Sequence, residues 1–399
     1  MPATPPLSAR LAHVPPTVFS EMSALAVRTG ALNLGQGFPD VDGPASVIAA
    51  AEAALEAGAN QYAPGIGVPA LREAIARHQQ RHYGLSPDPA TEVVVTTGCT
   101  EAVAAALLGM VDPGDEVVVL EPYYDSYVAM LEMCGARRVP VQLRAPAGST
   151  TTPRPDLDEL RAAVTDDTKL ILLNTPHNPT GTVLTREELQ VVADLAIAHD
   201  VLVVTDEVYE HLVFDDALSA EGHVPIATLP GMWERTLTLS SAGKSWSFTG
   251  WKVGWATGPA PLVQALLAAK QWLTFTSGSP LQPAVAHALD HEAEWPRALA
   301  RDLQARRDVL CGGLAAAGLA PRVPEGTYFA TTDISHLGWA DGREFCLALP
   351  KRAGVVAIPT QGFYDDPEAG RQLVRWAFCK VPDVIEECVR RLAAADLAR

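Results

Sequence analysis

Short apolar runs recur between Glu92 and Thr257, and helix-like stretches separate them. Continuous apolar runs are typical of strands that are covered on both faces, and strands that alternate with helices favour a parallel sheet. The runs predict strands at Val93–Thr96, Glu116–Leu120, Lys169–Asn174, Val201–Thr205, Thr236–Ser240 and Val253–Thr257. We therefore expect an α/β fold with a mostly parallel sheet and helices on both of its faces.

The other elements are predicted from their start and stop residues. A capping box at Thr185 and Glu188 marks one helix start, and Gly318 is a helix stop. Helices are expected at Glu21–Val27, Pro69–His82, Glu101–Val111, within residues 280–317 and after Pro382. Three further strands, predicted at Tyr328–Asp333, Val355–Ile358 and Leu373–Phe378, indicate a smaller α+β domain.

One lysine follows a predicted strand in unusual surroundings. Lys244 comes after the small residues Ser241-Ala-Gly, and aromatic residues up to Trp251 follow it. A partly dry pocket lowers the pKa of an amine from about 10.4 towards the range in which it is a nucleophile. Lys252 is a second cation, suited to a phosphate. A nucleophilic amine beside a phosphate site indicates pyridoxal phosphate.

Two other interpretations of the residues around Lys244 are possible. Lys244 alone could be a solvated surface cation. Ser241-Ala-Gly-Lys244 also matches the S-x-x-K motif of serine acyl-enzymes, but the companion S-D-N and K-T-G motifs of that class are absent from the sequence.

The composition excludes several classes of function. The 399 residues carry a net charge of −17, which argues against binding to nucleic acid or to anionic membranes. The six cysteines have no spacing typical of a metal site and indicate reduced thiols in a cytoplasmic protein. The first residues contain no apolar segment of the kind that directs export.

Polar or glycine residues follow several predicted strands, and ligands of α/β sheets bind at the carboxyl ends of strands. Gly98-Cys99-Thr100 precedes a helix whose first amides could hold a phosphate, although helix capping alone would also explain Thr100. Tyr124 could stack on a flat heterocycle or pack in the core. Asn178 could donate to a phenolic oxygen or serve an ordinary turn. Asp206 needs a partner when buried, and a pyridinium N–H would supply one.

Three more segments carry candidate ligand groups. Gly35 and Gly37 lie in a loop that allows close approach of the backbone to a ligand, or forms a plain turn. Arg375 lies within a predicted strand, where it could bind a substrate carboxylate or form a structural salt bridge. Residues 60–70 contain a partial dinucleotide fingerprint, but the expected strand does not precede it.

Taken together, these segments resemble class I pyridoxal-phosphate aminotransferases of fold type I along roughly the whole chain. The matching motifs are Asn33–Asp40, Asn60–Tyr62, His177–Gly181, Thr205–Tyr209, Ser241–Trp255 and Arg375–Lys380. The closest resemblance is to the branch that holds kynurenine, glutamine and methionine transaminases and the actinobacterial N-succinyldiaminopimelate aminotransferase.

The resemblance implies a seven-stranded sheet and three segments. Residues 1–45 would form an N-terminal arm and part of the small domain, residues 46–285 the large cofactor-binding domain, and residues 286–399 the small domain. It also implies a cytoplasmic homodimer with shared active sites.

The resemblance further assigns roles to individual residues. Lys244 would join the cofactor aldehyde and move a proton, and Asp206 would pair with the ring nitrogen. Tyr209 and Asn178 would bind the ring hydroxyl, and Tyr124 would stack on the ring. The phosphate would be held by residues from three parts of one chain and by one from the other subunit: Gly98, Cys99, Thr100, Ser241, Lys252 and the neighbour's Tyr62. Arg375, Gly37, Asn178 and Phe19 would bind the substrate.

The sequence departs from the family pattern at two positions of the site, and the one at Thr100 bears on the substrate. Lys252 stands where many relatives carry Arg, and Thr100 stands where kynurenine-type relatives carry an aromatic residue. The segment 272–279 lacks the Arg of aspartate transaminases. The best interpretation is N-succinyl-L,L-diaminopimelate as donor and 2-oxoglutarate as acceptor in a ping-pong reaction.

Other functions stay open on the sequence. A kynurenine-, glutamine- or methionine-type transaminase with cysteine-conjugate β-lyase side activity is the first alternative. A lyase or decarboxylase on the same fold would share the residues above. A cofactor-binding transcription factor would need a DNA-binding segment and a basic patch, and neither is seen in the sequence.

Overall fold

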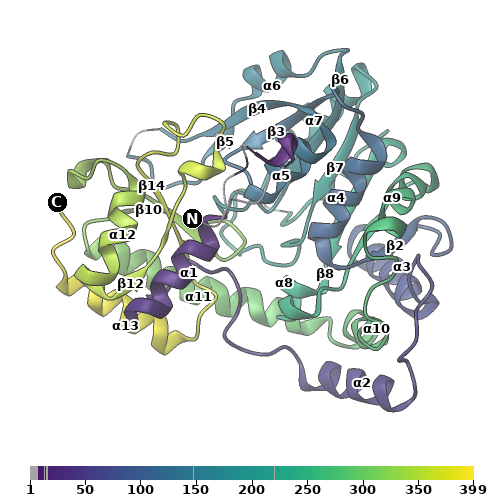
Figure 1. Cartoon of the computed structure of the whole chain (residues 1–399), viewed down its shortest axis with the longest axis horizontal. Helices are drawn as coiled ribbons and strands as arrows, with labels where there is room; N and C mark the ends of the chain where they lie inside the picture. Colours follow the sequence, from purple (N-terminus) through teal and green to yellow (C-terminus); the bar gives the residue numbers. More distant parts are fainter. Residues whose placement is uncertain (1–7, 13, 15–16, 147, 220) are drawn as a thin grey trace.

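The computed structural model describes residues 8–12, 14, 17–146, 148–219 and 221–399, so the first residues of the predicted arm lie outside it. The described chain forms a large sheet and a smaller one, each covered by helices (Figure 1). No described helix combines the length and the apolar character that a bilayer crossing requires.

The large sheet is mostly parallel, as predicted. Its order is β2-β9-β8-β7-β6-β3-β4-β5; β9 runs antiparallel to both of its neighbours, β2 and β8, and the edge strand β5 runs antiparallel to β4. The strands are β2 (Val93–Thr96), β3 (Glu116–Glu121), β4 (Arg137–Arg144), β5 (Arg154–Pro155), β6 (Thr168–Asn174), β7 (Leu202–Asp206), β8 (Thr236–Ser241) and β9 (Gly254–Thr257). The described sheet thus has one strand more than the seven expected, because the two-residue β5 adds an edge.

Six of these strands were predicted, and β4 was missed. Its sequence, Arg-Arg-Val-Pro-Val-Gln-Leu-Arg, has charged ends and an internal Pro, and only two of its residues, Val141 and Leu143, are buried. A strand near a sheet edge is covered less completely and therefore lacks the continuous apolar run of β3 or β6.

The helices of the structure are α1 (Val18–Thr29), α2 (Ala45–Glu56), α3 (Pro69–Tyr83), α4 (Gly98–Met110), α5 (Asp125–Cys134), α6 (Leu157–Ala163), α7 (Arg186–Ala198), α8 (Ala242–Ser245), α9 (Ala260–Leu273), α10 (Leu281–His291), α11 (Glu294–Ala316), α12 (Gly342–Ala353) and α13 (Pro382–Ala394). Both halves of the capping box predicted at the start of α7 are present. The long helical stretch predicted after residue 280 is divided into α10 and α11 by a short break.

Helices cover both faces of the large sheet, as expected. Alternate residues of β3 enter two different cores: Val117 and Val119 pack on the side of α4 and α5, and Val118 and Leu120 pack on the side of α6 and α7. A third core joins α2, α3 and α10 to β2 and β9. Successive side chains of a strand point to opposite faces of the sheet, and both faces are covered here. The residues of the run are therefore buried on whichever face they point to, which explains why the run is wholly apolar.

The smaller sheet has the order β10-β11-β14-β13 and is antiparallel throughout. Its strands are β10 (Ala320–Arg322), β11 (Phe329–Asp333), β13 (Ile358–Pro359) and β14 (Leu373–Ala377), and β1 (Leu32–Asn33) pairs separately with β12 (Val355–Val356). The single strand predicted at Val355–Ile358 is therefore two short strands with different partners. In Figure 1 the purple α1 lies among the yellow and green C-terminal elements.

The strand register brings separate sequence segments to one edge of the large sheet. Asn174 at the end of β6 lies beside Asp206 at the end of β7, and Asp206 lies beside Leu239 of β8. Gly254 of β9 lies between Thr96 and Ser241. The start of α4 and the segment after β8 consequently meet at the same edge.

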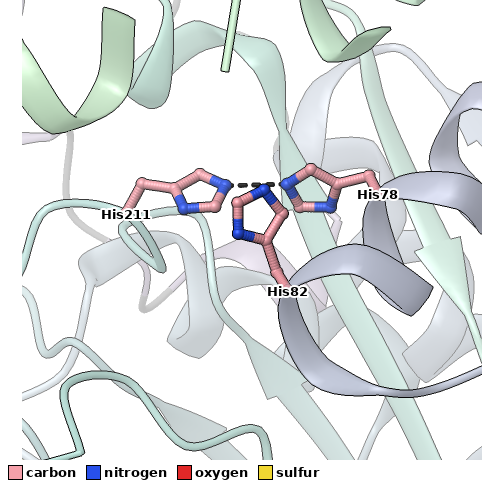
Figure 2. A group of neighbouring side chains, drawn as sticks. All are labelled: His78, His82 and His211. Atoms are coloured by element: carbon pink, nitrogen blue, oxygen red, sulfur yellow. Dashed lines mark hydrogen bonds between the residues drawn. The ribbon is translucent and has the colours of Figure 1, made fainter. Parts of the chain in front are cut away.

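Helix α3 packs where the large sheet meets the segment that follows β7. Two histidines one turn apart on α3, His78 and His82, face His211 of that segment (Figure 2). The Nε2 atoms of His78 and His211 are 2.7 Å apart.

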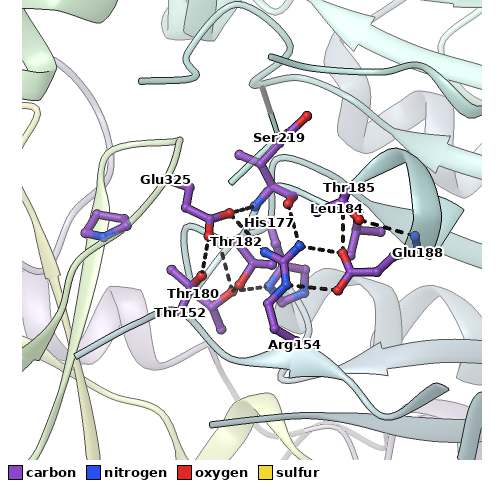
Figure 3. Close-up of polar contacts among 12 residues, drawn as sticks. Thr152, Arg154, His177, Thr180, Thr182, Leu184, Thr185, Glu188, Ser219 and Glu325 are labelled. Carbon is purple, nitrogen blue, oxygen red and sulfur yellow. Dashed lines mark hydrogen bonds and ion pairs between the residues drawn. The ribbon is translucent and has the colours of Figure 1, made fainter. Parts of the chain in front are cut away.

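A polar network fixes the loop that follows β6 (Figure 3). The carboxylate of Glu325 accepts hydrogen bonds from Thr152, Arg154 and the backbone N–H of Val183, each at 3.0 Å. Arg154 also pairs with Glu188 of the capping box, and the N–H of Glu325 donates to Gly181 O at 2.9 Å. The turn that carries Asn178 is thereby tied to both sheets.

We expect Gly254→Ala to distort the start of α4. A Cβ at Gly254 would lie 2.7 Å from the carbonyl carbon of Gly98 and 2.8 Å from Cys99 N, and neither backbone atom can move alone. The predicted loss is about 1–3 kcal/mol of unfolding free energy, measured by chemical denaturation.

The control for this change is Gly312→Ala in α11. A Cβ there meets no atom within 4 Å, so alanine should raise stability by roughly 0.5–1 kcal/mol through its helix propensity. Equal effects of the two substitutions would contradict the proposed contact.

Glu325→Ala should cost about 2–4 kcal/mol, because the buried Thr152 hydroxyl and the Val183 N–H lose their acceptor and the partly buried Arg154 keeps only Glu188 as its ionic partner. Denaturant unfolding measures the loss. Glu221→Ala removes the surface ion pair with Arg186, whose side chains are 56% and 46% exposed, and should leave stability unchanged. A Glu325→Ala variant as stable as Glu221→Ala would refute the role of the network.

Candidate active site

A cavity of about 320 Å³ opens at the carboxyl ends of β6, β7 and β8. Its wall includes residues from α1, α4, α5, β11 and β14 as well as the strand ends. Every predicted site residue except Tyr62 lines it: Phe19, Gly37, Gly98, Cys99, Thr100, Tyr124, Asn178, Asp206, Tyr209, Ser241, Lys244, Lys252 and Arg375.

Tyr62 lies outside this cavity. Its side chain is 83% exposed, and its ring packs edge-on against Phe275 with 5.4 Å between centroids. Within one described chain it therefore contributes nothing to the cavity wall.

The amine of Lys244 lies inside the cavity. Its Nζ donates to the hydroxyl of Tyr328 at 2.8 Å and to Gly37 O at 3.4 Å, and the Tyr328 hydroxyl donates to the same carbonyl at 2.6 Å. Removal of the amine from water lowers the pKa of Lys244 to about 8. At neutral pH a usable fraction of the amine is consequently unprotonated.

A buried carboxylate faces the same cavity. Asp206 is 6% exposed, and its Oδ2 accepts a hydrogen bond from the Tyr127 hydroxyl at 2.7 Å. Its Oδ1 accepts the backbone N–H of Val208 at 3.2 Å. Burial raises the pKa of Asp206, so its charged form gains from any cationic partner in the cavity.

The start of α4 forms an open anion site. The side chain of the N-cap residue Thr97 accepts no hydrogen bond from the first amides of this helix. The next residue, Gly98, has a φ of 74°, a conformation that favours glycine. A Cβ at Gly98 would lie 3.2 Å from the Nζ of Lys252, so glycine leaves the space between the helix start and that ammonium open. Within the described chain Lys252 has no ion pair. These groups suit a phosphate.

Arg375 is fully buried at the other side of the cavity. Its Nη1 donates to Asn178 Oδ1 and its Nη2 to Gly35 O, both at 2.9 Å. The guanidinium lies 4.0 Å from the centroid of the Phe329 ring and 4.7 Å from that of Phe19.

This guanidinium lacks an anionic partner within the described chain, because its acceptors are a neutral amide and a carbonyl. Its Nε has no partner there. Burial lowers the pKa of Arg375 to about 10, and the group still carries its charge at neutral pH. A carboxylate in the cavity would supply the missing countercharge.

Four tyrosine hydroxyls lie around these charged groups. Tyr209 packs edge-on against Tyr328 with 5.3 Å between ring centroids, and Tyr124 packs edge-on against Tyr127 at 5.6 Å. Burial raises the pKa of Tyr124 to about 12, so its hydroxyl stays protonated.

Sequence reasoning missed Tyr127 and Tyr328. Tyr328 is only the first residue of a predicted strand and Tyr127 lies in no predicted element, and no local pattern marks either as different from a core tyrosine. Tyr127 follows Tyr124 by one helical turn, which is the only local signal that both face one side.

The chain was compared with known proteins. The sequence profile of the family "Aminotransferase class I and II" matches residues 29–391. A Mycobacterium tuberculosis protein described as a probable N-succinyldiaminopimelate aminotransferase is 51% identical over 96% of this chain and 97% of its own. A solved structure of N-succinyldiaminopimelate aminotransferase from that organism aligns with a TM-score of 0.94 at 51% identity, covering 98% of this chain and all of that one.

Two other relatives are more distant. Methionine aminotransferase of Escherichia coli is 39% identical over 96% of this chain and 97% of its own. Kynurenine–oxoglutarate transaminase 3 of Mus musculus is 39% identical over 94% of this chain and 87% of its own. With a matching family profile over nearly the whole chain and a fold shared with solved aminotransferases, the protein belongs to the class I and II aminotransferases and is an enzyme of that family.

Proposed function

We propose that the cavity holds pyridoxal 5'-phosphate and that the enzyme transfers the amino group of N-succinyl-L,L-diaminopimelate to a 2-oxo acid, with 2-oxoglutarate as the expected acceptor. The reaction is ping-pong, because both substrates use the same cavity. The observation that carries the proposal is the Lys244 amine held in one cavity with a buried Asp206 carboxylate and an uncapped helix start.

The residues of the cavity fit this cofactor by charge and by hydrogen bonding. Phosphate would be bound by the first amides of α4, the Ser241 hydroxyl and the Lys252 ammonium. Asp206 is a buried carboxylate that gains from a cationic N–H, and Tyr124 offers an aromatic face. When bound, the cofactor supplies an aldehyde that captures the substrate amine and a ring that withdraws electrons from the substrate α-carbon.

Lys244 is the group that moves the proton. Its amine, with a pKa of about 8, would take a proton from the substrate α-carbon and deliver it to the carbon that had been the cofactor's aldehyde carbon. The Tyr328 hydroxyl and Gly37 O hold the nitrogen on one side of the cavity, which limits the positions it can reach. Tyr328 is therefore a positioning residue for Lys244.

Asp206 and its partners orient the ring that they bind. The Tyr127 hydroxyl and the Val208 N–H each donate a hydrogen bond to the carboxylate and fix its orientation. A carboxylate held in this way would accept a hydrogen bond from a ring N–H without first having to reorient. Tyr209 and Asn178 would donate to the phenolic oxygen of the cofactor.

Arg375 would bind the α-carboxylate of the substrate. Its guanidinium is pre-positioned by its hydrogen bonds to Asn178 and Gly35 and by its contacts with the rings of Phe19 and Phe329, so little ordering is left to the binding step. Gly37 would lie against the same carboxylate.

We also propose a cytoplasmic homodimer. The exposed Tyr62 would reach the phosphate site of the second subunit, and each cavity would then need both chains. The six cysteines are buried and unpaired, which fits a reducing compartment. The domain boundaries at residues 45 and 285 stay a prediction.

The most specific part of the proposal is the identity of the amino-group donor. The 51% identity to the Mycobacterium tuberculosis protein supports N-succinyldiaminopimelate. The described cavity wall, however, has only three cations, Lys244, Lys252 and Arg375, and the proposal uses all of them before the distal carboxylate is bound. This favours a methionine-, glutamine- or kynurenine-type donor as the second candidate, with β-lyase activity on cysteine conjugates.

The first test is the reaction of cofactor-free protein with pyridoxal phosphate. Only the neutral amine attacks an aldehyde, so the rate should rise with pH through about 8, the pKa of Lys244, and not through the value of about 10.4 of a free lysine. Absorbance follows the rate, and borohydride reduction with peptide mass mapping should locate the adduct at Lys244.

The controls for this test are two lysine variants. Lys244→Ala should form no adduct and have no transaminase activity, whereas Lys351→Ala, at an exposed position in α12, should behave as the natural protein. An adduct at another lysine would overturn the assignment.

The second test is a panel of donors with 2-oxoglutarate fixed. N-succinyl-L,L-diaminopimelate should give the highest kcat/KM among that compound, methionine, glutamine, kynurenine and aspartate. A preference for methionine or kynurenine would select the second candidate. Pyruvate and ammonia released from a cysteine conjugate without an acceptor would demonstrate the lyase activity.

A further inference from the structure

Three imidazole rings converge outside the cavity, at the contact between α3 and the segment after β7 (Figure 2). One ring nitrogen from each of His78, His82 and His211 lies within 4.8 Å of the other two. The ring centroids are 4.6 Å apart for His78 and His82 and 4.9 Å apart for each of the other pairs. In Figure 2 a nitrogen of His82 points at the line between the other two rings.

The geometry points to a metal site: we propose that His78, His82 and His211 bind one divalent cation of the late first transition row, with Zn²⁺ as the best fit. Imidazole nitrogen is the donor that Zn²⁺, Cu²⁺ and Ni²⁺ favour, and three such donors leave a fourth tetrahedral position for water. This cation has no part in the transamination proposed above.

The spacing of the ligands is close to what the metal needs. Zn–N bonds of about 2.0–2.1 Å in a tetrahedron place ligand nitrogens ~3.3 Å apart. The Nε2 atoms of His78 and His211 are 2.7 Å apart, so they separate slightly on binding, and His82 moves inward. His78 and His82 are one helical turn apart on α3, so a single face of the helix presents both rings.

The protonation state also suits a metal. Burial lowers the pKa of His78 well below its usual range, that of His82 to about 4 and that of His211 to about 3. All three rings are therefore neutral at pH 7 and have lone pairs to donate.

The surrounding charges are mixed. Arg81 and Arg297 lower the pKa values of His82 and His211, and Glu210 acts in the opposite direction on His82. Glu210 accepts hydrogen bonds from the hydroxyls of Tyr83 and Ser240, the latter at 2.6 Å, so it belongs to the layer of residues that surrounds the three histidines. A negative group in this layer favours a bound cation.

A cation held here would cross-link α3 to the segment that carries the candidate active site. His211 follows Asp206 and Tyr209 in the same segment, and its ring packs edge-on against Trp246 with 5.8 Å between centroids. Trp246 comes two residues after Lys244. The expected effect of the metal is therefore on the stability of this region and not on its chemistry.

A ring pair without metal is the competing explanation. The Nε2 atoms of His78 and His211 can share one proton in a hydrogen bond, which satisfies these two nitrogens but leaves the buried His78 Nδ1 without a partner in the described chain. It gives no role to His82, however, whereas the metal requires all three rings. His82 therefore separates the two explanations.

The experiment uses untagged, cofactor-loaded, full-length protein, stripped of metal by chelation and dialysis. Titration with Zn²⁺ against a coloured competing chelator should give one site per chain, and Zn²⁺ should raise the melting temperature. Co²⁺ should produce the intense visible bands of a tetrahedral centre. His82→Gln and His211→Gln should each weaken Zn²⁺ binding by more than about 10-fold.

The chain offers a matched control in α10. His287 and His291 form another pair one turn apart, with ring centroids 4.7 Å apart and, among the described residues, no third histidine beside them. His287→Gln should leave the tight site unchanged. Full Zn²⁺ affinity in His82→Gln, or loss of it in His287→Gln, would overturn the proposal. If a variant does not fold, a natural protein that shows no tetrahedral Co²⁺ bands overturns it equally.

Discussion

The structure depends on keeping two charged groups out of water at one edge of the large sheet. Asp206 ends β7 and Lys244 lies in the short helix α8 that follows the neighbouring parallel strand β8, and burial shifts the pKa of each towards its neutral form. In the described chain neither group has a strong ionic partner. Their reactivity follows from this lack of compensation, because a group that gains much from a ligand is ready to bind one.

The remainder of the fold makes this arrangement possible. The cores on both faces of the sheet hold the strand ends in fixed positions. Because Gly254 has no side chain, β9 can pack in direct contact with the start of α4. The Glu325 network ties the Asn178 turn to both sheets, and Arg375 reaches that turn from β14. The cavity is thus assembled from the two sheets together.

Much of the architecture follows from the sequence. Six strands of the large sheet were predicted within a residue or two, since covered strands have continuous apolar runs and their ends carry the polar residues. The same reasoning failed at β4, which is half exposed, and at Val355–Ile358, where one apolar run serves two pairings. Partner choice is a property of the fold and leaves no local pattern.

The sequence by itself determined the parallel sheet, the residues at its strand ends and, through the family motifs, about half of the residues that line the cavity. Only the tertiary structure decided which side chains surround those residues: Tyr127 on Asp206, Tyr328 on Lys244, and His211 beside the histidines of α3. Each of these contacts joins segments far apart in the chain. Local patterns record which face of an element is buried, whereas contacts across elements depend on how the elements pack.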